Sequence, residues 1–270
     1  MNQSQIIVVP AEMTFLKPIL IPDLARIGRA NDGGYVIPRS LIDSTDGLVS
    51  LGVSDDWSFE KNFKELNPNV IVHSYDHTVS NVHFFINMIS SLLKFCLGRN
   101  GFQNIKTSIF NLFDFMNFFR GSNRHFKERV FSRIDNINDA TPEIIMSRLK
   151  CQNIFIKMDI EGSEYRVLKD FLKYKENIVG LVVEFHDTEP LRPVFIETLK
   201  AILEDYWIVH FHENNAVGLP EDGFPEVVEI TFLRRDLVDL DSPKYRYEFP
   251  IPGLDQPNLR MSPSHFFQFE

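Results

Sequence analysis

The chain has 270 residues, of which 44% are hydrophobic and 24% are charged, as is typical of a folded globular protein and not of a disordered one. Its net charge is −9 and its Lys and Arg residues form no basic cluster, which argues against nucleic acid as a partner. Two cysteines, Cys96 and Cys151, are too few for a disulfide framework or a four-thiolate zinc site, so we expect buried thiols in a reducing compartment.

The first half of the chain contains apolar runs of strand length and of helical spacing, separated by turn residues. These patterns predict an irregular N-terminal segment over 1–45, strands over 48–51 and 70–75, helices over 57–66 and 81–97, and a candidate strand over 129–134 within an otherwise unassigned stretch, 98–135. No basic region opens the sequence, so we expect no secretory signal.

Residues 81–97 are the best candidate for a membrane segment. Their polar residues fall on one helical face, and the opposite apolar stripe is formed by Phe85, Ile89, Leu92 and Cys96. The segment is too short and too striped to span a bilayer, and it lacks the basic face that favours binding on a membrane surface. We therefore expect an amphipathic helix packed on a core.

The second half has a clearer pattern, in which apolar strands alternate with helices. It predicts a helix beginning at 141–143, a strand over 154–158, a helix over 163–172, a strand over 178–185, a helix over 194–204, strands over 206–211 and 227–233, and an extended Pro-containing tail over 236–270. This alternation predicts one α/β domain over 1–270, with a mostly parallel sheet and helices on both of its faces.

Ligands bind such sheets at the carboxyl ends of the strands, and polar residues follow five of the predicted strands. These polar segments are 52–56, 76–78, 159–162, 184–187 and 212–215. We therefore expect a site at this edge of the sheet.

Gly52 and Asp76 follow the first two central strands and are separated by 24 positions. A glycine there lets the backbone approach a nucleoside, and an acid about 20 residues further on accepts hydrogen bonds from both ribose hydroxyls. No glycine series for a pyrophosphate is present, so S-adenosylmethionine fits the pattern. Taken alone, the pair is better explained as a turn glycine and a loop cap.

Two further strand ends carry groups suited to catalysis. Asp159 and Glu161 are placed to face the cleft, whereas Ser163 is expected to cap the next helix and Glu164 to offset its dipole. Strand alternation puts Glu184 and His186 on the same side, and a histidine can act as a general base near neutral pH. A helix cap and a solvated loop explain Glu184 and His186 equally well.

The last strand end and the possible metal ligands complete the candidate site. His212, Asn214 and Asn215 offer hydrogen-bonding groups suited to a polyhydroxyl ligand, although an ordinary turn has the same composition. A divalent ion such as Mg²⁺ or Ca²⁺ would find its ligands among Asp159, Glu161, Glu184, His186 and Asp187. Carboxylates are common on an acidic protein, so we favour the absence of a metal.

Several segments resemble FkbM-type, S-adenosylmethionine-dependent methyltransferases. They are GRANDGGYV (28–36), LVSLGVSDDWSFE (48–60), YDHT (75–78), FIKMDIEGSEYRVL (155–168), VVEFHD (182–187) and HENNAVG (212–218). The resemblance implies a Rossmann-like methyltransferase fold with a seven-stranded sheet, the last strand being antiparallel. It also implies O-methylation, often of a sugar hydroxyl in a glycan or a glycosylated metabolite.

The resemblance further assigns roles to residues of the predicted cofactor site. Gly33, Gly52, Val53 and Ser54 would line the cofactor, with Gly52 and its neighbours at the methionine end. Asp76 would hold the ribose, and Asp159 would lie near the sulfonium.

The sequence thus predicts an O-methyltransferase that uses S-adenosylmethionine and acts on a carbohydrate hydroxyl. His186 is the predicted general base, with Glu161 as the second choice. One alternative is a catalytically silent protein of the same fold that binds the cofactor or glycans, and another is a hydrolase that uses Ser54, or a carboxylate pair with His186. The absent signal and the intracellular cofactor predict a cytoplasmic location, and the oligomeric state is open.

Overall fold

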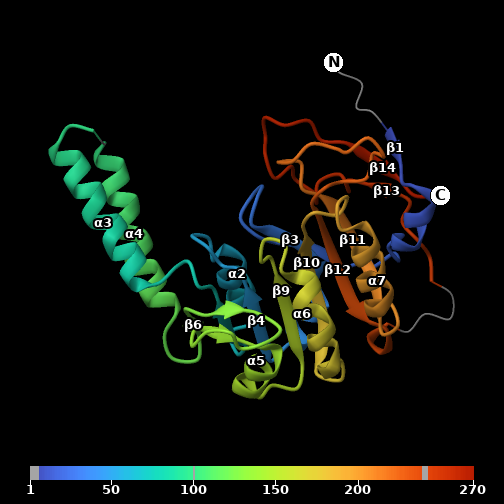
Figure 1. Ribbon diagram of the computed structural model, residues 1–270, viewed down its shortest axis with the longest axis horizontal. Helices are drawn as coiled ribbons and strands as arrows, with labels where there is room; N and C mark the ends of the chain where they lie inside the picture. Colours follow the sequence, from blue (N-terminus) through green and yellow to red (C-terminus); the bar gives the residue numbers. More distant parts are fainter. Residues whose placement is uncertain (1–5, 100, 239–242) are drawn as a thin grey trace.

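The structure is a computed structural model, and it describes residues 6–99, 101–238 and 243–270. Its centre is a seven-stranded sheet in the order β11-β12-β10-β9-β4-β5-β6 (Figure 1). The strands are β4 (Gly47–Leu51), β5 (Ile71–Tyr75), β6 (Arg124–Phe126), β9 (Ile154–Met158), β10 (Ile178–Phe185), β11 (Tyr206–Glu213) and β12 (Val228–Arg234). Only β12 runs antiparallel to its neighbours in this sheet, which confirms the predicted mostly parallel α/β fold.

Helices cover both faces of the sheet, as predicted (Figure 1). One face packs against α5 (Pro142–Leu149), α6 (Glu164–Phe171) and α7 (Arg192–Ile202). The other packs against α1 (Arg39–Ser44), α2 (Ser58–Leu66) and the hairpin of β2 (Leu24–Gly28) and β3 (Gly34–Pro38). Every residue of β4, β9 and β10 is buried, because strands covered on both sides have no solvent face.

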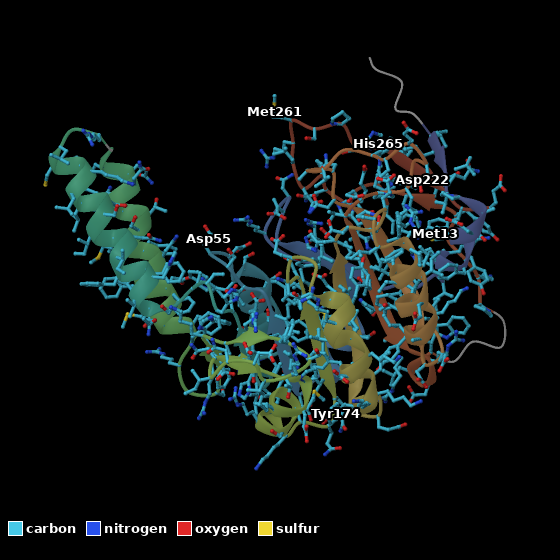
Figure 2. The ribbon with its side chains drawn as sticks, in the orientation of Figure 1. Met13, Asp55, Tyr174, Asp222, Met261 and His265 are labelled. Carbon is cyan, nitrogen blue, oxygen red and sulfur yellow. The ribbon has the colours of Figure 1, made fainter. Side chains whose placement is uncertain are left out.

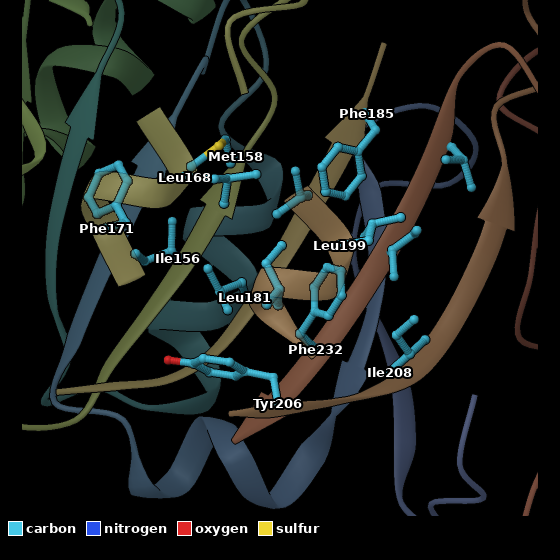
Figure 3. Packing of buried hydrophobic residues seen from close by; sticks show 14 of the residues in the cluster. Ile156, Met158, Leu168, Phe171, Leu181, Phe185, Leu199, Tyr206, Ile208 and Phe232 are labelled. Atoms are coloured by element: carbon cyan, nitrogen blue, oxygen red, sulfur yellow. The ribbon is translucent and has the colours of Figure 1, made fainter. Parts of the chain in front are cut away.

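The apolar layer beneath α6 and α7 shows how the sheet is held to its helices. Met158 and Leu181 of the sheet lie beside Leu168 of α6 and Leu199 of α7 (Figure 3). All four side chains are buried, and burying a side chain of this size contributes about 1.5–3 kcal/mol to stability. This packing fixes the carboxyl ends of β9 and β10.

The start of α5 agrees with the sequence, but the start of α6 does not. The Thr141 hydroxyl accepts from the Ile144 N–H at 3.4 Å, with Pro142 in the first turn. Ser163 makes no side-chain cap. Instead the buried Glu164 carboxylate accepts from the N–H groups of Ile160, at 3.1 Å, and Gly162, at 3.2 Å. The Ser163 cap is thus corrected, whereas Glu164 lies in the first turn of α6, where its charge was expected to offset the helix dipole.

Only the first two residues of the candidate strand over 129–134 form a strand, and that strand does not join the central sheet. The sheet's outer strand is β6, and β7 (Arg129–Val130) pairs outside the sheet with β8 (Asp139–Ala140). Arg129 donates two hydrogen bonds to Asp139, at 3.0 and 3.1 Å, which close this small pair. Backbone hydrogen bonds join the same two segments, so β7 depends on a partner about ten residues further along the chain that the local apolar pattern does not contain.

The predicted amphipathic helix exists, but it does not pack on a core through its apolar stripe. It is α3 (Asn81–Cys96), and it forms a hairpin with α4 (Phe102–Phe118) that projects from the body of the molecule (Figure 1). Phe85, Ile89, Leu92 and Cys96 are exposed, because α3 meets α4 through its other face. No helix in the described part of the chain is long and apolar enough to cross a membrane.

The cysteine prediction is also corrected in part. Cys96 is exposed on α3, and Cys151 is half-buried. Burial raises the pKa of the Cys151 thiol to about 11.

The first and last described strands lie together on one side of the molecule (Figure 1). β1 (Ile6–Val8) pairs with β14 (Phe266–Gln268), which also pairs with β13 (Glu248–Phe249). Short 3-10 helices complete the described elements: η1 (Ala11–Leu16), η2 (Leu172–Tyr174) and η3 (Arg235–Leu237). Of the predicted tail and N-terminal segment, residues 239–242 and 1–5 lie outside the described residues.

Candidate active site

Two cavities open at the carboxyl ends of β4, β5, β9 and β10, the edge that the sequence indicated. Their volumes are about 520 and 250 Å³. Both are lined by Gly52, Ser54, Asp159 and Glu161, so these residues form the wall between them. Figure 2 shows Asp55, which lines the larger cavity, between the helical hairpin and the body of the molecule.

Close packing of the backbone explains why position 52 is a glycine. Its φ is +78°, a conformation that favours glycine, and a Cβ there would collide with the carbonyl oxygen of Asp159. The Asp159 N–H donates to the Leu51 carbonyl at 3.0 Å, which holds the two strand ends together. The close backbone approach predicted from Gly52 therefore exists, and its partner is the end of β9.

Asp76 holds the loop that follows β4. One carboxylate oxygen accepts from the N–H groups of Val53, at 3.1 Å, and Ser54, at 2.7 Å. The other accepts from the N–H and the hydroxyl of Thr78, at 2.7 and 2.6 Å. Burial alone would raise the pKa of Asp76, but the hydrogen bonds from Thr78 and Ser54 outweigh it and lower the pKa.

These four hydrogen bonds use the four acceptor positions of a carboxylate. Asp76 does line the smaller cavity, as the ribose assignment requires. A ribose hydroxyl can bond to it only by replacing one of its present donors. The exchangeable donor is the Thr78 side-chain hydroxyl, since the backbone N–H groups are fixed by the chain.

Gly33 lines the larger cavity from the turn between β2 and β3. Its φ is +83°, and a Cβ would collide with the carboxylate of Asp56. That carboxylate forms an ion pair with Arg29 at 2.9 Å and accepts from the Ser58 N–H at 3.0 Å. Gly33 thus lies beside the loop after β4 and lines the larger cavity only, and its predicted contact with the cofactor stays a prediction.

Lys157 is a buried cation in this wall that the sequence analysis did not single out. Its ammonium donates to the Gly52 carbonyl at 2.5 Å and lies 3.6 Å from the Asp159 carboxylate. Burial alone would lower the pKa of Lys157, but the charges of Asp159, Glu60 and Glu184 raise it, so the side chain is charged. The signal was present as one lysine in the otherwise apolar run Ile154–Met158.

Tyr35 joins the two strand ends that carry the acidic groups. Its hydroxyl donates toward Asp159 at 3.1 Å and toward Glu184 at 3.4 Å. The Asn214 amide donates to the other oxygen of Glu184 at 2.8 Å. Burial, followed by the negative charge of Asp159, raises the pKa of Glu184 to about 8. Glu184 is therefore a carboxyl group that exchanges a proton near neutral pH.

His186 lies beside Glu184, as strand alternation predicted, and carboxylates surround it. Its Nδ1 is 3.2 Å from Glu164, and its Nε2 is 3.6 Å from Glu184 and 3.5 Å from Glu161. Burial alone would lower the pKa of His186, but the hydrogen bond and charge of Glu164, followed by Glu184, raise it to about 9. An imidazolium is a hydrogen-bond donor at neutral pH and not a base, so this geometry does not favour the predicted role.

Asp159, Glu184 and His186 also have the spacing of a metal site. One ligand atom from each lies within 4.8 Å of the other two. Each group has a partner within the chain as well, Tyr35 for the two carboxylates and Glu164 for the imidazole. The expectation that no metal ion is required at this cluster stays a prediction, which chelation tests. Asp187, proposed as a further ligand, lines neither cavity.

Of the three predicted substrate-binding residues, only Asn214 lines the larger cavity. The Asn215 amide donates to the carbonyls of Leu259, at 3.0 Å, and Ser262, at 3.2 Å, and so holds the C-terminal tail. His212 lies 3.1 Å from the side-chain oxygen of Asn258 in the same tail. The polar groups of His212 and Asn215 are thus used to attach the tail, and Asn258 of the tail reaches the cavity wall.

Comparisons with known proteins concern the fold. No known family model matches the sequence, and neither does any curated protein. Among solved structures, the chain is similar to the fibrillarin/Nop5p complex, with 13% identity and a TM-score of 0.37 over 72% of this chain and 73% of that chain. It is similar to the precorrin-6y C5,15-methyltransferase of Geobacter metallireducens GS-15, with 11% identity and a TM-score of 0.34 over 73% and 88%.

A third similar structure is a candidate RNA methyltransferase of Pyrococcus horikoshii, with 15% identity and a TM-score of 0.35 over 73% of this chain and 77% of that one. Sequence identities and TM-scores this low give no ground for assigning the activities of these proteins to this chain. The sheet itself has seven strands and one antiparallel member, β12, which is the last of the seven in the chain. The chain therefore has a Rossmann-like α/β fold, with the seven-stranded sheet and the antiparallel last strand that the sequence resemblance implied.

Proposed function

We propose that the protein is an S-adenosylmethionine-dependent O-methyltransferase of the FkbM type that acts on a neutral hydroxyl acceptor such as a carbohydrate. The observation that carries the proposal is the wall of Gly52 and Asp159 between two cavities, one lined by Asp76 and the other by Glu184 and His186. A nucleoside in the smaller cavity and an acceptor in the larger one would meet at Asp159. This arrangement is what methyl transfer requires, because acceptor and donor must be aligned at one point.

The charge of the larger cavity supports an uncharged acceptor inside it and a positively charged sulfonium at its wall, beside Asp159. Seven carboxyl side chains line it, against one lysine and one arginine: Asp32, Asp55, Asp56, Glu60, Asp159, Glu161 and Glu184. S-adenosylmethionine, when bound, supplies an electrophilic methyl group on a positively charged sulfonium. An acidic cavity attracts a cation and repels phosphates, so nucleotide-linked sugars are the less suitable acceptors.

In the proposed reaction, Glu184 takes the proton of the acceptor hydroxyl. Its carboxylate lines the cavity, and Asn214 and Tyr35 fix the orientation of its two oxygens. A base whose pKa lies near the working pH is the most effective one. His186, as an imidazolium 3.6 Å away, stabilises the ionised form of Glu184, and Glu164 holds the imidazolium in place. Asp159 faces both cavities and would lie at the sulfonium.

One observation favours the silent alternative, a protein that has the fold without the activity. Asp76 is already saturated by donors of its own chain. The hydrolase alternative is less well supported, because activation of Ser54 needs a neutral histidine and the carboxylates around His186 favour the charged form.

Calorimetry with S-adenosylmethionine tests the proposal, followed by transfer of a labelled methyl group to neutral glycans and nucleotide-linked sugars. We expect binding, and transfer to the neutral acceptors. Asp76→Ala should weaken binding at least tenfold, since one lost hydrogen bond to a charged acceptor costs about 1.5–3 kcal/mol, whereas Asp170→Ala, at a surface ion pair, should not. Absence of binding rejects the proposal, and binding without transfer to any acceptor supports the silent alternative.

A further inference from the structure

The hairpin of α3 and α4 is firmly attached at its base and free of the body elsewhere (Figures 1 and 2). At the base, the Trp57 ring lies 5.4 Å from that of Phe84 and 5.3 Å from that of Phe115. Asp114 accepts from the Trp57 indole at 2.9 Å and pairs with Lys61 at 2.8 Å. The hairpin is therefore a fixed projection that can present a surface.

The free surface of this hairpin is unusually apolar. Of the 26 large apolar side chains exposed in the described residues, 13 lie between Val82 and Met116. On α3, the seam toward α4 is formed by Phe84 and by Ser91, which bonds to Ser108 at 2.8 Å. Helical spacing turns Phe85, Ile89, Leu92 and Leu93 away from this seam, and all four are exposed. An exposed apolar face of this extent indicates an interaction surface.

The charge of the same segment is opposite to that of the whole chain. Residues 77–113 contain no Asp or Glu, although the net charge of the chain is −9. Lys94, Arg99 and Lys106 are exposed near the turn between the two helices. The first carboxylate beyond them, Asp114, is already paired at the base. Two hairpins packed turn to turn would bring six cations together. A surface that carries negative charge above an apolar layer instead complements both the basic side chains and the apolar face.

We propose that the α3–α4 hairpin binds the surface of an anionic lipid bilayer. The outer face of α3 would lie in the headgroup region, and the three basic side chains would contact lipid phosphates. A helix of 16 residues is about 24 Å long, enough for an interfacial helix that does not span the bilayer. The sequence of α3 alone has no basic face, because Arg99 and Lys106 come from the turn and from α4.

Sedimentation of the full chain with vesicles tests this inference without relying on the proposed enzymatic activity. We expect binding to vesicles that contain about one third phosphatidylserine, and much less to pure phosphatidylcholine. Because one basic residue near such a surface is worth about 1 kcal/mol, Lys94→Gln and Lys106→Gln should each weaken binding about fivefold. Raising the salt from about 0.1 to 0.5 M should weaken binding of the unmodified chain, since it shortens the screening length.

The apolar part is tested with Ile89→Glu combined with Leu93→Glu. We expect at least a tenfold loss of vesicle binding, with Ile137→Glu as the matched control because Ile137 is 93% exposed outside the hairpin. Circular dichroism checks that the variants fold, and the milder Phe85→Ser gives a second measurement. Failure of the unmodified chain to bind anionic vesicles overturns the inference. So does a dimer in sedimentation velocity that the double variant abolishes while vesicle binding is unchanged, because that result assigns the face to a second copy.

Discussion

Replacing Glu164 by glutamine should weaken the binding of the proton that His186 holds in the folded protein. The pKa of His186 is raised from 6.5 to about 9, which corresponds to about 3 kcal/mol of interaction with the charged imidazole. Glu164 is fully buried and 3.2 Å from Nδ1, and it makes the largest of the contributions that raise this pKa. An opposite charge at this distance moves a pKa by about 1–3, so the variant should lower that of His186 by at least about one.

Proton NMR titration of the His186 ring measures this change directly and needs neither substrate nor cofactor. Glu161→Gln is the matched control, because Glu161 is at a similar distance, 3.5 Å, but is 87% exposed and screened by water. The Glu161→Gln variant should shift the pKa of His186 by less than about 0.3. The reasoning is refuted if both variants leave the titration of His186 unchanged, or if the control shifts it as much as Glu164→Gln does.

The same pKa fixes the sign of the stability change. The folded protein binds the His186 proton more tightly than the unfolded chain does, so this contribution is complete below pH 6.5 and is lost as the pH rises through about 9. Urea denaturation at pH 6 and pH 10 should therefore show a larger difference for the unmodified chain than for Glu164→Gln.

Four further outcomes are expected from the proposed site. Glu184→Gln should reduce turnover by about 10²–10⁴-fold with nearly unchanged cofactor affinity in calorimetry, and turnover of the unmodified enzyme should rise with pH toward about 8, because only the ionised carboxylate accepts a proton. Thr78→Val should not weaken cofactor binding if a ribose hydroxyl replaces the Thr78 hydroxyl on Asp76; a tenfold loss would contradict that exchange. Gly52→Ala should lower the thermal midpoint by several degrees, since overpacking costs about 1–3 kcal/mol, whereas Gly218→Ala, with open space around it, should have no effect. Exhaustive chelation should leave methyl transfer intact, and a loss restored by Mg²⁺ would assign an ion to the acidic cluster.

The sequence predicted well those features that depend on local periodicity. The continuous apolar run of β10 identified a strand buried on both faces, and its alternation put Glu184 and His186 on one side. Polar residues after each strand located the edge at which both cavities open. These inferences succeed because strand geometry fixes where neighbouring side chains point, whatever the rest of the fold does.

Features that depend on distant partners were not predictable in the same way. Tyr35 and Lys157 meet at the acidic cluster although 122 positions separate them, and no local pattern relates β3 to β9. The amphipathic pattern of α3 revealed an apolar face but not what that face contacts. Asn215 has the composition of a ligand-binding turn, yet its partners belong to a tail some 45 residues further along the chain.

The antiparallel strand β12 connects the fold to the chemistry of the site. Its register places Glu229 directly opposite Glu184 of β10, so two carboxyl groups face each other inside the protein. Burial and the charge of Glu184 raise the pKa of Glu229 well above its usual value, and the Asn258 amide donates to it at 2.8 Å. Two such groups cannot both be ionised cheaply, so Glu229 keeps its proton while Glu184, with the imidazolium beside it, titrates near neutral pH.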